Sequence, residues 1–297
     1  MWIAVAVVAL IVVDVVLVSL ALGRTATAQN GPAGPIPTFS SSARPSVTPT
    51  PSASATPSAG VADDASASRL LSAVDGKEAW RASRTSCSAG KAVLEHSVDG
   101  GATWVAVALG DDVRALTGLR ATTTGVSVLV GVGDDCAATV RTSADDGATW
   151  AAGQPGAAGA GVTDTALQLK SGRIASPCTD PVDAYQGQYT TLVACSDSVA
   201  WRNGTSAWVT APIAGIQSIA DAGNTYTLAR TGAATCAGVE VLSLPAVKVT
   251  ASSAVSPVGC WTEGTSSGPV AIDLAGTSLW AWAGDTVAVS ADGGASW

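Results

Sequence analysis

The residues best able to do chemistry in this sequence are aspartates gathered in glycine-containing turns. The tripeptide GDD occurs at residues 110–112 and again at 133–135, and a later stretch carries one aspartate at the equivalent place. Carboxylates on one face could form an acidic rim for a polar ligand, although solvated turn aspartates are the simpler interpretation. The candidate ligand-binding residues are Asp111, Asp112, Asp134, Asp135 and Asp285.

Neither a metal site nor a histidine-based catalytic site is favoured. A calcium loop needs about six converging oxygens, whereas each of these turns offers one or two carboxylates. His96 is the single histidine, which leaves little for a mixed Cys/His zinc site or a catalytic triad. We therefore expect no metal and no cofactor, and we assign no catalytic residue.

The composition indicates a chain with a large core and no affinity for nucleic acid. Hydrophobic residues make up 47% of the 297 residues, and the formal net charge is -8. No basic stripe with interleaved aromatic residues is present, so nucleic acid is not an expected partner. The six cysteines are an even number with no Cys-x-x-Cys pair, which favours disulfides in an oxidising compartment.

The first 67 residues of the sequence are predicted to form a targeting segment followed by a spacer. Residues 2–22 are apolar except for Asp14 and Ser19, and they are long enough to cross a bilayer. We predict a transmembrane signal anchor over residues 1–24, and we give Asp14 no role. A cleavable signal peptide is the alternative, because ATA at residues 26–28 fits the small-x-small cleavage rule.

Residues 25–67 are rich in proline, serine and threonine, so they cannot form a core and predict a disordered stalk. The remaining domain, residues 68–297, is then held on the extracytoplasmic side of the cell membrane by a single-pass anchor. Arg24, which follows the apolar run, argues weakly for the opposite orientation. The cysteine pattern and the stalk outweigh it.

An eight-residue phrase occurs three times in this domain. It reads SVDGGATW at residues 97–104, SADDGATW at 143–150 and SADGGASW at 290–297. The first two copies are 46 residues apart and the last two are 147 apart, close to three such periods. We therefore expect two degenerate copies between them, at residues 199–208 and 236–250.

Each period reads as four short strands separated by Gly/Asp turns. In the second period these strands are residues 113–122, 125–133, 137–143 and 148–153, which are rich in β-branched side chains. Helical periodicity is absent after residue 22. Five four-stranded units at this spacing predict an all-β, five-bladed β-propeller.

The pattern Ser-x-Asp-x-Gly-x-Thr-Trp resembles the Asp-box, or BNR repeat, of sialidases, sortilin-like receptors and photosystem II assembly factors. The resemblance implies that each copy forms the turn between the third and fourth strands of a blade. The aspartate would fix the turn, the glycine would supply a positive φ and the tryptophan would pack on a neighbouring sheet. The third copy departs from the pattern, because Ser296 replaces the threonine. The motif residues are Ser97, Asp99, Gly101, Thr103, Trp104, Ser143, Asp145, Gly147, Thr149, Trp150, Ser290, Asp292, Gly294 and Trp297.

The residues that a sialidase requires are not found. A sialidase needs an arginine triad, a Tyr/Glu nucleophile pair and an acidic residue that acts as the acid/base. This chain resembles such enzymes only in the repeat. The nearest match to the family's Arg-Ile-Pro motif is GRIAS at residues 172–176, which lacks the proline, and Tyr185 and Tyr189 fall in a predicted loop. The resemblance therefore implies a fold without an activity.

The predicted strands also suggest how the cysteines pair. Cys87, Cys136 and Cys236 each fall between a second and a third strand, and Cys260 lies in a blade-to-blade connection on that same face. The remaining pair rests on proximity within one long loop. The predicted disulfides are Cys87–Cys136, Cys178–Cys195 and Cys236–Cys260.

The final copy of the phrase ends at Trp297, so the last blade is expected to have three strands instead of four. Either the sequence stops within this blade, or residues before Arg69 supply the missing strand. Ring closure should place residues 69–76 beside residues 268–276.

We expect the protein to act as a non-catalytic binding or assembly module at the bacterial cell surface. Its partner would be an unknown cell-surface protein or a glycan. The alternative is a cell-wall or glycan-processing glycoside hydrolase, although the spacing places no two carboxylates at the separation that such chemistry needs. A third possibility is a structural surface protein without a discrete ligand.

Overall fold

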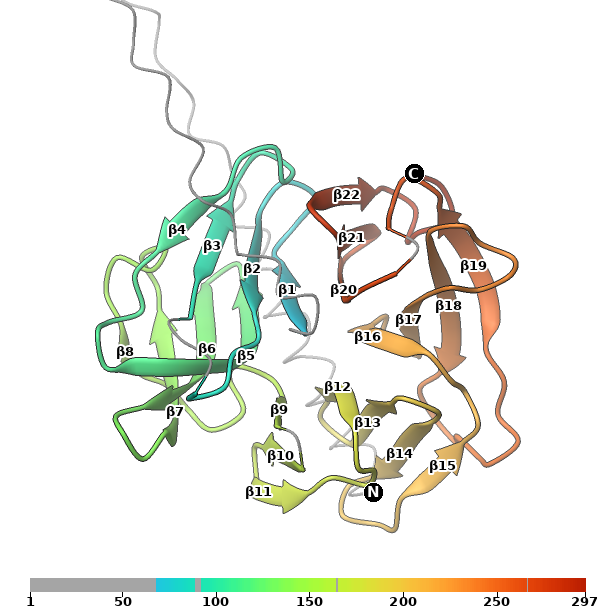
Figure 1. Ribbon diagram of the computed structural model, residues 1–297, viewed down its shortest axis with the longest axis horizontal. Helices are drawn as coiled ribbons and strands as arrows, with labels where there is room; N and C mark the ends of the chain where they lie inside the picture. The colour runs from blue at the N-terminus through green and yellow to red at the C-terminus, as the bar shows by residue number, and fades with distance from the viewer. Residues whose placement is uncertain (1–67, 89–91, 164, 266) are drawn as a thin grey trace, which may run out of the picture. The chain divides into compact units, whose positions relative to one another are not determined.

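The described part of the chain forms six antiparallel sheets around a central axis (Figure 1). The computed structural model describes residues 68–88, 92–163, 165–265 and 267–297. Over these ranges the protein is an all-β, six-bladed propeller. The expected number of five blades is therefore wrong.

Four of the described sheets have four strands and two have three. The first sheet comprises β1 (Arg69–Ala73), β2 (Ala79–Ser83), β3 (Leu94–Ser97) and β4 (Val105–Val107). The second comprises β5 (Val113–Thr122), β6 (Gly125–Val132), β7 (Ala137–Ser143) and β8 (Ala151–Ala152). The third comprises β9 (Gly161–Thr163), β10 (Ala166–Leu169) and β11 (Gly172–Ala175). The fourth comprises β12 (Pro181–Gln186), β13 (Thr190–Cys195), β14 (Val199–Asn203) and β15 (Val209–Ala211). The fifth comprises β16 (Ile216–Asp221), β17 (Thr225–Thr231), β18 (Val239–Pro245) and β19 (Ser256–Trp261). The sixth comprises β20 (Val270–Ala275), β21 (Ser278–Ala283) and β22 (Thr286–Ser290).

The first strand of each sheet lies next to the axis (Figure 1). Neighbouring inner strands contact each other in chain order, and β20 returns to contact β1. This contact closes the ring, which confirms the expected proximity of residues 69–76 and 268–276. The sixth sheet has the three strands that the sequence predicts for the last blade.

The expected blade number is wrong because the blades are unequal in length. Successive inner strands begin at residues 69, 113, 161, 181, 216 and 270, so no single period fits them. The expected degenerate copy at residues 199–208 covers β14 and the turn before β15, and the one at residues 236–250 covers β18. The unforeseen blade is the third, whose short glycine- and alanine-rich strands carry no copy of the phrase.

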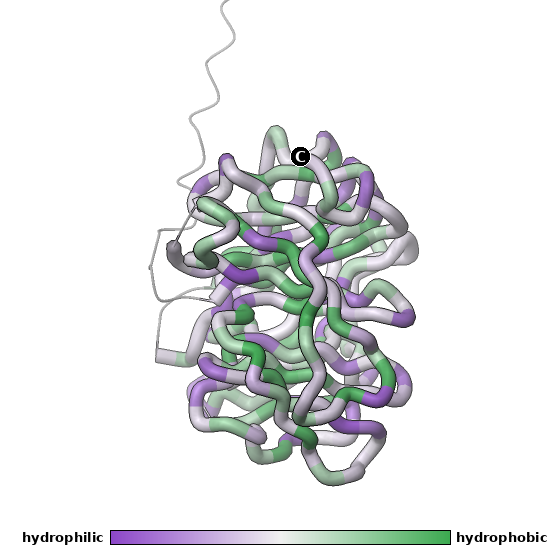
Figure 2. Tube along the Cα trace, turned by 90° about the vertical axis from the view of Figure 1, so that its right-hand side faces the viewer, coloured by the Kyte–Doolittle hydropathy of each residue, from purple (hydrophilic) through white to green (hydrophobic). Residues whose placement is uncertain are grey.

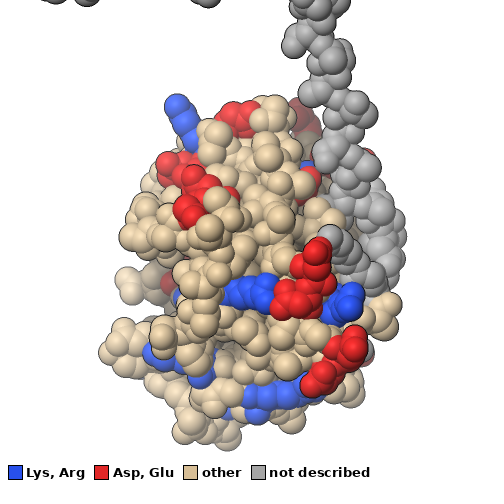
Figure 3. Space-filling model, turned by 90° about the vertical axis from the view of Figure 1, so that its left-hand side faces the viewer, with Lys and Arg blue, Asp and Glu red and all other residues tan. Residues whose placement is uncertain are grey.

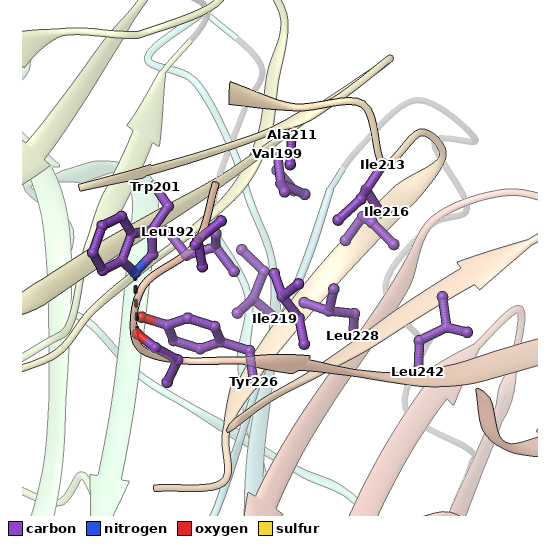
Figure 4. Close-up of a cluster of buried hydrophobic side chains, with 14 residues drawn as sticks. Leu192, Val199, Trp201, Ala211, Ile213, Ile216, Ile219, Tyr226, Leu228 and Leu242 are labelled. Carbon is purple, nitrogen blue, oxygen red and sulfur yellow. Dashed lines mark hydrogen bonds between the residues drawn. The ribbon is translucent and has the colours of Figure 1, made fainter. Parts of the chain in front are cut away.

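Apolar side chains fill the space between adjacent sheets. Between the fourth and fifth sheets Leu192, Ile219, Leu228 and Leu242 interleave in one cluster (Figure 4). The Trp201 indole in this cluster donates to the backbone carbonyl of residue 246 at 3.2 Å. Figure 2 views the ring from the side and shows many hydrophilic segments in its peripheral loops. Inter-sheet burial of this kind supplies the main driving force for closing the ring.

All three copies of the phrase form the same hydrogen-bonded turn. In the second copy the Ser143 hydroxyl donates to Asp145 Oδ1 at 2.8 Å and accepts the Gly147 N–H at 2.8 Å. The other copies repeat these bonds within 0.2 Å. In each copy the aspartate also accepts the N–H and the hydroxyl of the residue four positions later, at 2.9 and 2.6 Å. Hydrogen bonds from Thr103 lower the pKa of Asp99 to about 2, and those from Ser296 do the same for Asp292.

The tryptophan that ends each copy contacts the preceding sheet. Trp104 meets Trp280 of the sixth sheet edge to face, with ring centroids 6.4 Å apart. Trp297 stacks on Trp261 of the fifth sheet at 5.4 Å. The Trp150 indole donates to the carbonyl of residue 108, in the connection that leaves the first sheet, at 2.8 Å. The repeated turn therefore joins neighbouring blades, and its carboxylate is used for structure.

The three predicted disulfides are all present. Cys87 pairs with Cys136, Cys178 with Cys195 and Cys236 with Cys260, with Cα atoms 6.0, 6.3 and 5.7 Å apart. Two expectations of their setting are wrong. Cys260 lies within the outer strand β19 and not in a blade-to-blade connection, and Cys195 ends strand β13, so Cys178 and Cys195 do not share one loop. The first disulfide links the first and second sheets.

The transmembrane anchor expected over residues 1–24 and the stalk expected over residues 25–67 lie outside the described residues. In the part of the chain that the structure describes, no helix is long and apolar enough to cross a membrane.

Removing the turn serine should destabilise the ring. Ser143 is buried, and Ser143→Ala leaves the buried Gly147 N–H without its acceptor, so we expect a loss of about 1–3 kcal/mol in the free energy of unfolding. Denaturant titration measures this. Thr123→Ala, at an exposed turn position, is the matched control. Equal stability of the two variants would contradict a structural role for the turn.

Candidate binding cavity on the propeller axis

Two cavities lie on the axis, lined by opposite ends of the inner strands. One has a volume of about 430 Å³ and is lined by the C-terminal ends, including Ala73, Thr122, Gln186, Asp221 and Leu274. Because antiparallel strands alternate in direction, this end of the ring also carries the turns of the three repeats, and we name this space the turn-side cavity. The second cavity, of about 530 Å³, is lined by the N-terminal ends.

An arginine joins two opposite blades through residues that line these cavities. Arg84 follows β2 in the first sheet and reaches β12 of the fourth sheet, the blade opposite in the ring. Its guanidinium donates to the carbonyl of Val182 at 2.6 Å and to Asp183 Oδ1 at 3.3 Å. Val182 lines the N-terminal cavity and Asp183 lines the turn-side cavity. Burial raises the pKa of the Asp183 carboxyl, while the charge of Arg84 opposes that shift.

Polar side chains join the inner strands of neighbouring blades. Ser72 accepts the N–H of residue 121 at 2.9 Å, and Asp183 accepts that of Ile219 at 2.9 Å. Ser218 accepts the N–H of residue 272 at 3.0 Å, and Asp273 accepts that of residue 73 at 2.8 Å. These bonds cover four of the six junctions in the described ring. They satisfy backbone donors at the axis that have no partner within their own sheet.

The third sheet approaches its neighbour more closely. A Cβ on Gly118 of β5 would lie 3.1 Å from the carbonyl oxygen of Ala158, so a larger residue there would push on the chain before β9. Residues 158–160 thereby reach the axis and form part of the wall of the turn-side cavity.

The mouth of the turn-side cavity holds a tyrosine and a carboxylate in contact. The Tyr185 hydroxyl of β12 donates to Asp221 Oδ2 of β16 at 2.5 Å, and Asp221 Oδ1 accepts the N–H of Gly223 at 2.9 Å. Burial and the acceptor Asp221 raise the pKa of Tyr185, so it stays a hydrogen-bond donor. Beside it the Gln186 amide oxygen accepts the N–H of Lys170 at 2.8 Å.

Asp273 is a second carboxyl of this cavity whose pKa is raised. It lines the turn-side cavity from β20, and burial raises its pKa to about 6. The backbone N–H groups, Ser72 and the charge of Arg120 lower it only in part. A carboxyl that titrates near pH 6 can carry a proton or give one up under physiological conditions.

The candidate residues named from the sequence lie away from these cavities. Asp112 accepts a hydrogen bond from Arg141, and Asp134 lies 3.8 Å from Arg114 with a fully exposed side chain. Asp135 lines a separate cavity of about 220 Å³ beside the second and third sheets. Asp111 and Asp285 are exposed in a connection and a turn. On the side formed by the first two sheets, acidic and basic side chains lie next to one another (Figure 3). None of the five aspartates lines either axial cavity.

The charged and tyrosine residues that line the turn-side cavity lie outside the repeated phrase, so they were not named from the sequence as binding candidates. Tyr185 was expected in a loop but lies in β12, and Arg120 and Asp273 lie in inner strands that were correctly expected. The sequence signal that could have identified them is a charged residue inside a run of apolar strand residues, because a buried charged side chain needs a polar partner or a polar cavity. Among the described residues, no group of three or more His, Cys, Asp and Glu side chains could hold a metal ion.

No protein-family model matches the sequence, and no curated protein matches it. Solved structures with similar folds include the following three. The GH74 enzyme of Niastella koreensis shares 15% identity over 75% of this chain with a TM-score of 0.41, and the chain spans only 45% of that enzyme. YCF48 bound to D1 peptide shares 12% identity over 78% of this chain and 81% of its own, with a TM-score of 0.42. The Penicillium chrysogenum alpha-L-arabinanase complexed with arabinobiose shares 11% identity over 76% and 77%, with a TM-score of 0.39. Likenesses this distant assign no ligand and no activity to this chain.

The raised pKa of Asp273 predicts how stability depends on pH. Because the folded state holds the proton up to about pH 6, whereas a free aspartate loses it near 3.8, stability falls as the pH rises through this window. Asp273→Asn removes the buried charge and should stabilise the protein at pH 7.5 by on the order of 1–3 kcal/mol. The gain should vanish near pH 4.

Denaturant titrations at both pH values measure this difference, and Asp285→Asn at an exposed turn is the control. A gain that is the same at both pH values would show that the Asp273 carboxyl is not titrating in this window.

Proposed function

We propose that this protein is an extracytoplasmic binding module that holds its ligand in the turn-side cavity and leaves the ligand chemically unchanged. The observation that carries this proposal is the convergence of polar side chains from separate blades on one cavity. Arg120 comes from β5, Tyr185 and Gln186 from β12, Asp221 from β16 and Asp273 from β20. A concave site with a few convergent polar groups is the usual form of a binding pocket.

The contacts of the carboxylates support binding in preference to catalysis. Asp183 is committed to Arg84 and to the backbone of β16, and Asp221 to Tyr185 and Gly223. A carboxylate that must act as a nucleophile or base needs access to the reacting atom. These two are held by the ring itself.

A glycan-processing hydrolase is the second candidate, and one observation favours it. Asp273 and Asp221 line the same cavity, and the pKa of Asp273 is raised to about 6. Glycoside hydrolysis uses two carboxyl groups in one cavity, and the one that acts as the acid has a raised pKa.

The disulfides support a place outside the cytoplasm, since three of them persist only in an oxidising compartment. With residues 1–24 as an anchor and residues 25–67 as a stalk, the propeller would present its cavity to a cell-surface protein or glycan. Attachment to the membrane is part of this proposal.

Binding of the full chain to a glycan array, with released sugars measured in parallel, separates the two functions. A binding module retains bound glycan and releases no product. Asp221→Ala should then weaken retention by at least about tenfold through loss of the Tyr185 contact, while the exposed Asp285→Ala should not. Product release that disappears in Asp273→Asn would instead identify a hydrolase.

A further inference from the structure

Two side chains of the turn-side cavity carry hydrogen-bond donors without acceptors. Arg120 is half-buried in the cavity wall, and its guanidinium forms no hydrogen bond or ion pair with any described residue. The Gln186 amide oxygen is held by the N–H of Lys170. Its Nε2 group has no acceptor in the described part of the chain. A guanidinium offers five N–H donors in a planar fork, so most of the donor capacity in this cavity is unused.

The acceptors of the same cavity are already occupied. Asp183 accepts from Arg84 and from two backbone N–H groups. Asp221 accepts from Tyr185 and Gly223, and Asp273 accepts the N–H of residue 73. The cavity therefore has donors to offer and few acceptors, which favours a ligand that brings acceptor oxygens.

The positive charge of Arg120 favours one class of ligand among those that bring acceptor oxygens. A neutral ligand without acceptor oxygens would displace water from the Arg120 guanidinium and leave its N–H donors unsatisfied, which is costly. An anionic ligand removes that cost, and a carboxylate matches the fork of the guanidinium with two parallel hydrogen bonds.

A monoanion fits this cavity better than a dianion. Once Asp183 is paired with Arg84, the charged residues left in the lining are Arg69 and Arg120 against Asp221 and Asp273. The formal charges of these four residues cancel, so a bound anion must be met locally by the Arg120 guanidinium, which suits a ligand with one negative charge. Arg69 donates to the backbone carbonyl of Gly284, so a phosphate dianion would face two carboxylates with both of its charges on the Arg120 fork.

Resting on the function proposed above, we propose that the ligand of the turn-side cavity is a small organic carboxylate whose carboxyl group is bound by Arg120 and Gln186. The volume of about 430 Å³ suits a molecule the size of a sugar acid or a capped amino acid. Residues 158–160 close the cavity beside Arg120, where a Cβ on Gly159 would lie 4.0 Å from the guanidinium nitrogens. The glycine leaves room next to the fork.

Calorimetric titration of the full chain with matched pairs tests this assignment. The probes are glucuronate against glucuronamide and N-acetylalanine against N-acetylalaninamide, with inorganic phosphate as a third arm. We expect at least one carboxylate to bind with a Kd of about 1 mM or tighter. Its amide should bind at least about tenfold more weakly, because the amide lacks the charge.

Variants locate the binding site. Arg120→Gln should weaken carboxylate binding at least about tenfold and Arg120→Lys should retain part of it, because a lysine keeps the charge but not the fork. Arg114→Gln is the matched control, since Arg114 lies in the same strand with a half-exposed side chain. Circular dichroism should show that all three variants fold.

Four outcomes would overturn the proposal: equal affinity for acid and amide, undiminished binding in Arg120→Gln, tighter binding of phosphate, or no binding of any carboxylate at about 10 mM. A glycan that is retained by the wild type and by Arg120→Gln alike, but lost in Asp221→Ala, would overturn this inference and leave the binding function standing.

Discussion

The closure of the ring depends on how neighbouring blades join at the axis, where no sheet can pair with the next. Each inner strand has one edge bonded within its own blade, and its other edge meets a strand of another blade. At four junctions a serine or aspartate oxygen accepts the backbone N–H of that neighbour, as with Ser218 and residue 272. A buried N–H without an acceptor costs about as much as a lost hydrogen bond. These side chains therefore satisfy the backbone and set the spacing of the strands at once.

The same requirement shapes the cavity. The polar side chains that close the ring lie on the inner strands. The turn-side cavity is therefore lined by charged side chains, although the space between the sheets is apolar. Arg84 uses part of this charge to join opposite blades through Asp183, and Tyr185 joins β12 to β16 through Asp221. Arg120 is the member of this set that closure does not use. Axial side chains whose hydrogen bonds are satisfied within the ring belong to the scaffold. The side chain with unused donors, Arg120, is the one assigned to the proposed binding function.

The sequence predicted the parts of this fold that repeat and missed the part that does not. Three copies of one turn located the third strand of three blades and the fourth strand of two. Strand positions were enough to pair Cys87 with Cys136, whereas the Cys236–Cys260 pair was predicted correctly although Cys260 was placed in a connection and lies in β19. The third blade was missed because β9–β11 carry no turn motif and span far fewer residues than the others. The cavity residues were missed for a different reason. Arg120, Asp221 and Asp273 come from separate blades, and only the closed ring brings them together. Acidic turns such as the one with Asp134 were chosen as candidates because a few adjacent residues are enough to recognise them. The Asp134 side chain is fully exposed and lies outside both axial cavities.

Amide hydrogen exchange tests the central claim that side-chain oxygens close the ring. The N–H groups of residues 73, 121, 219 and 272 should exchange only through global unfolding, because each is bonded to a side chain of the neighbouring blade. In Ser218→Ala the N–H of residue 272 should exchange faster than in the wild type, while that of residue 121 keeps its protection. Rapid exchange of all four in the wild type, or an equal change at residues 121 and 272 in the variant, would contradict this account of ring closure.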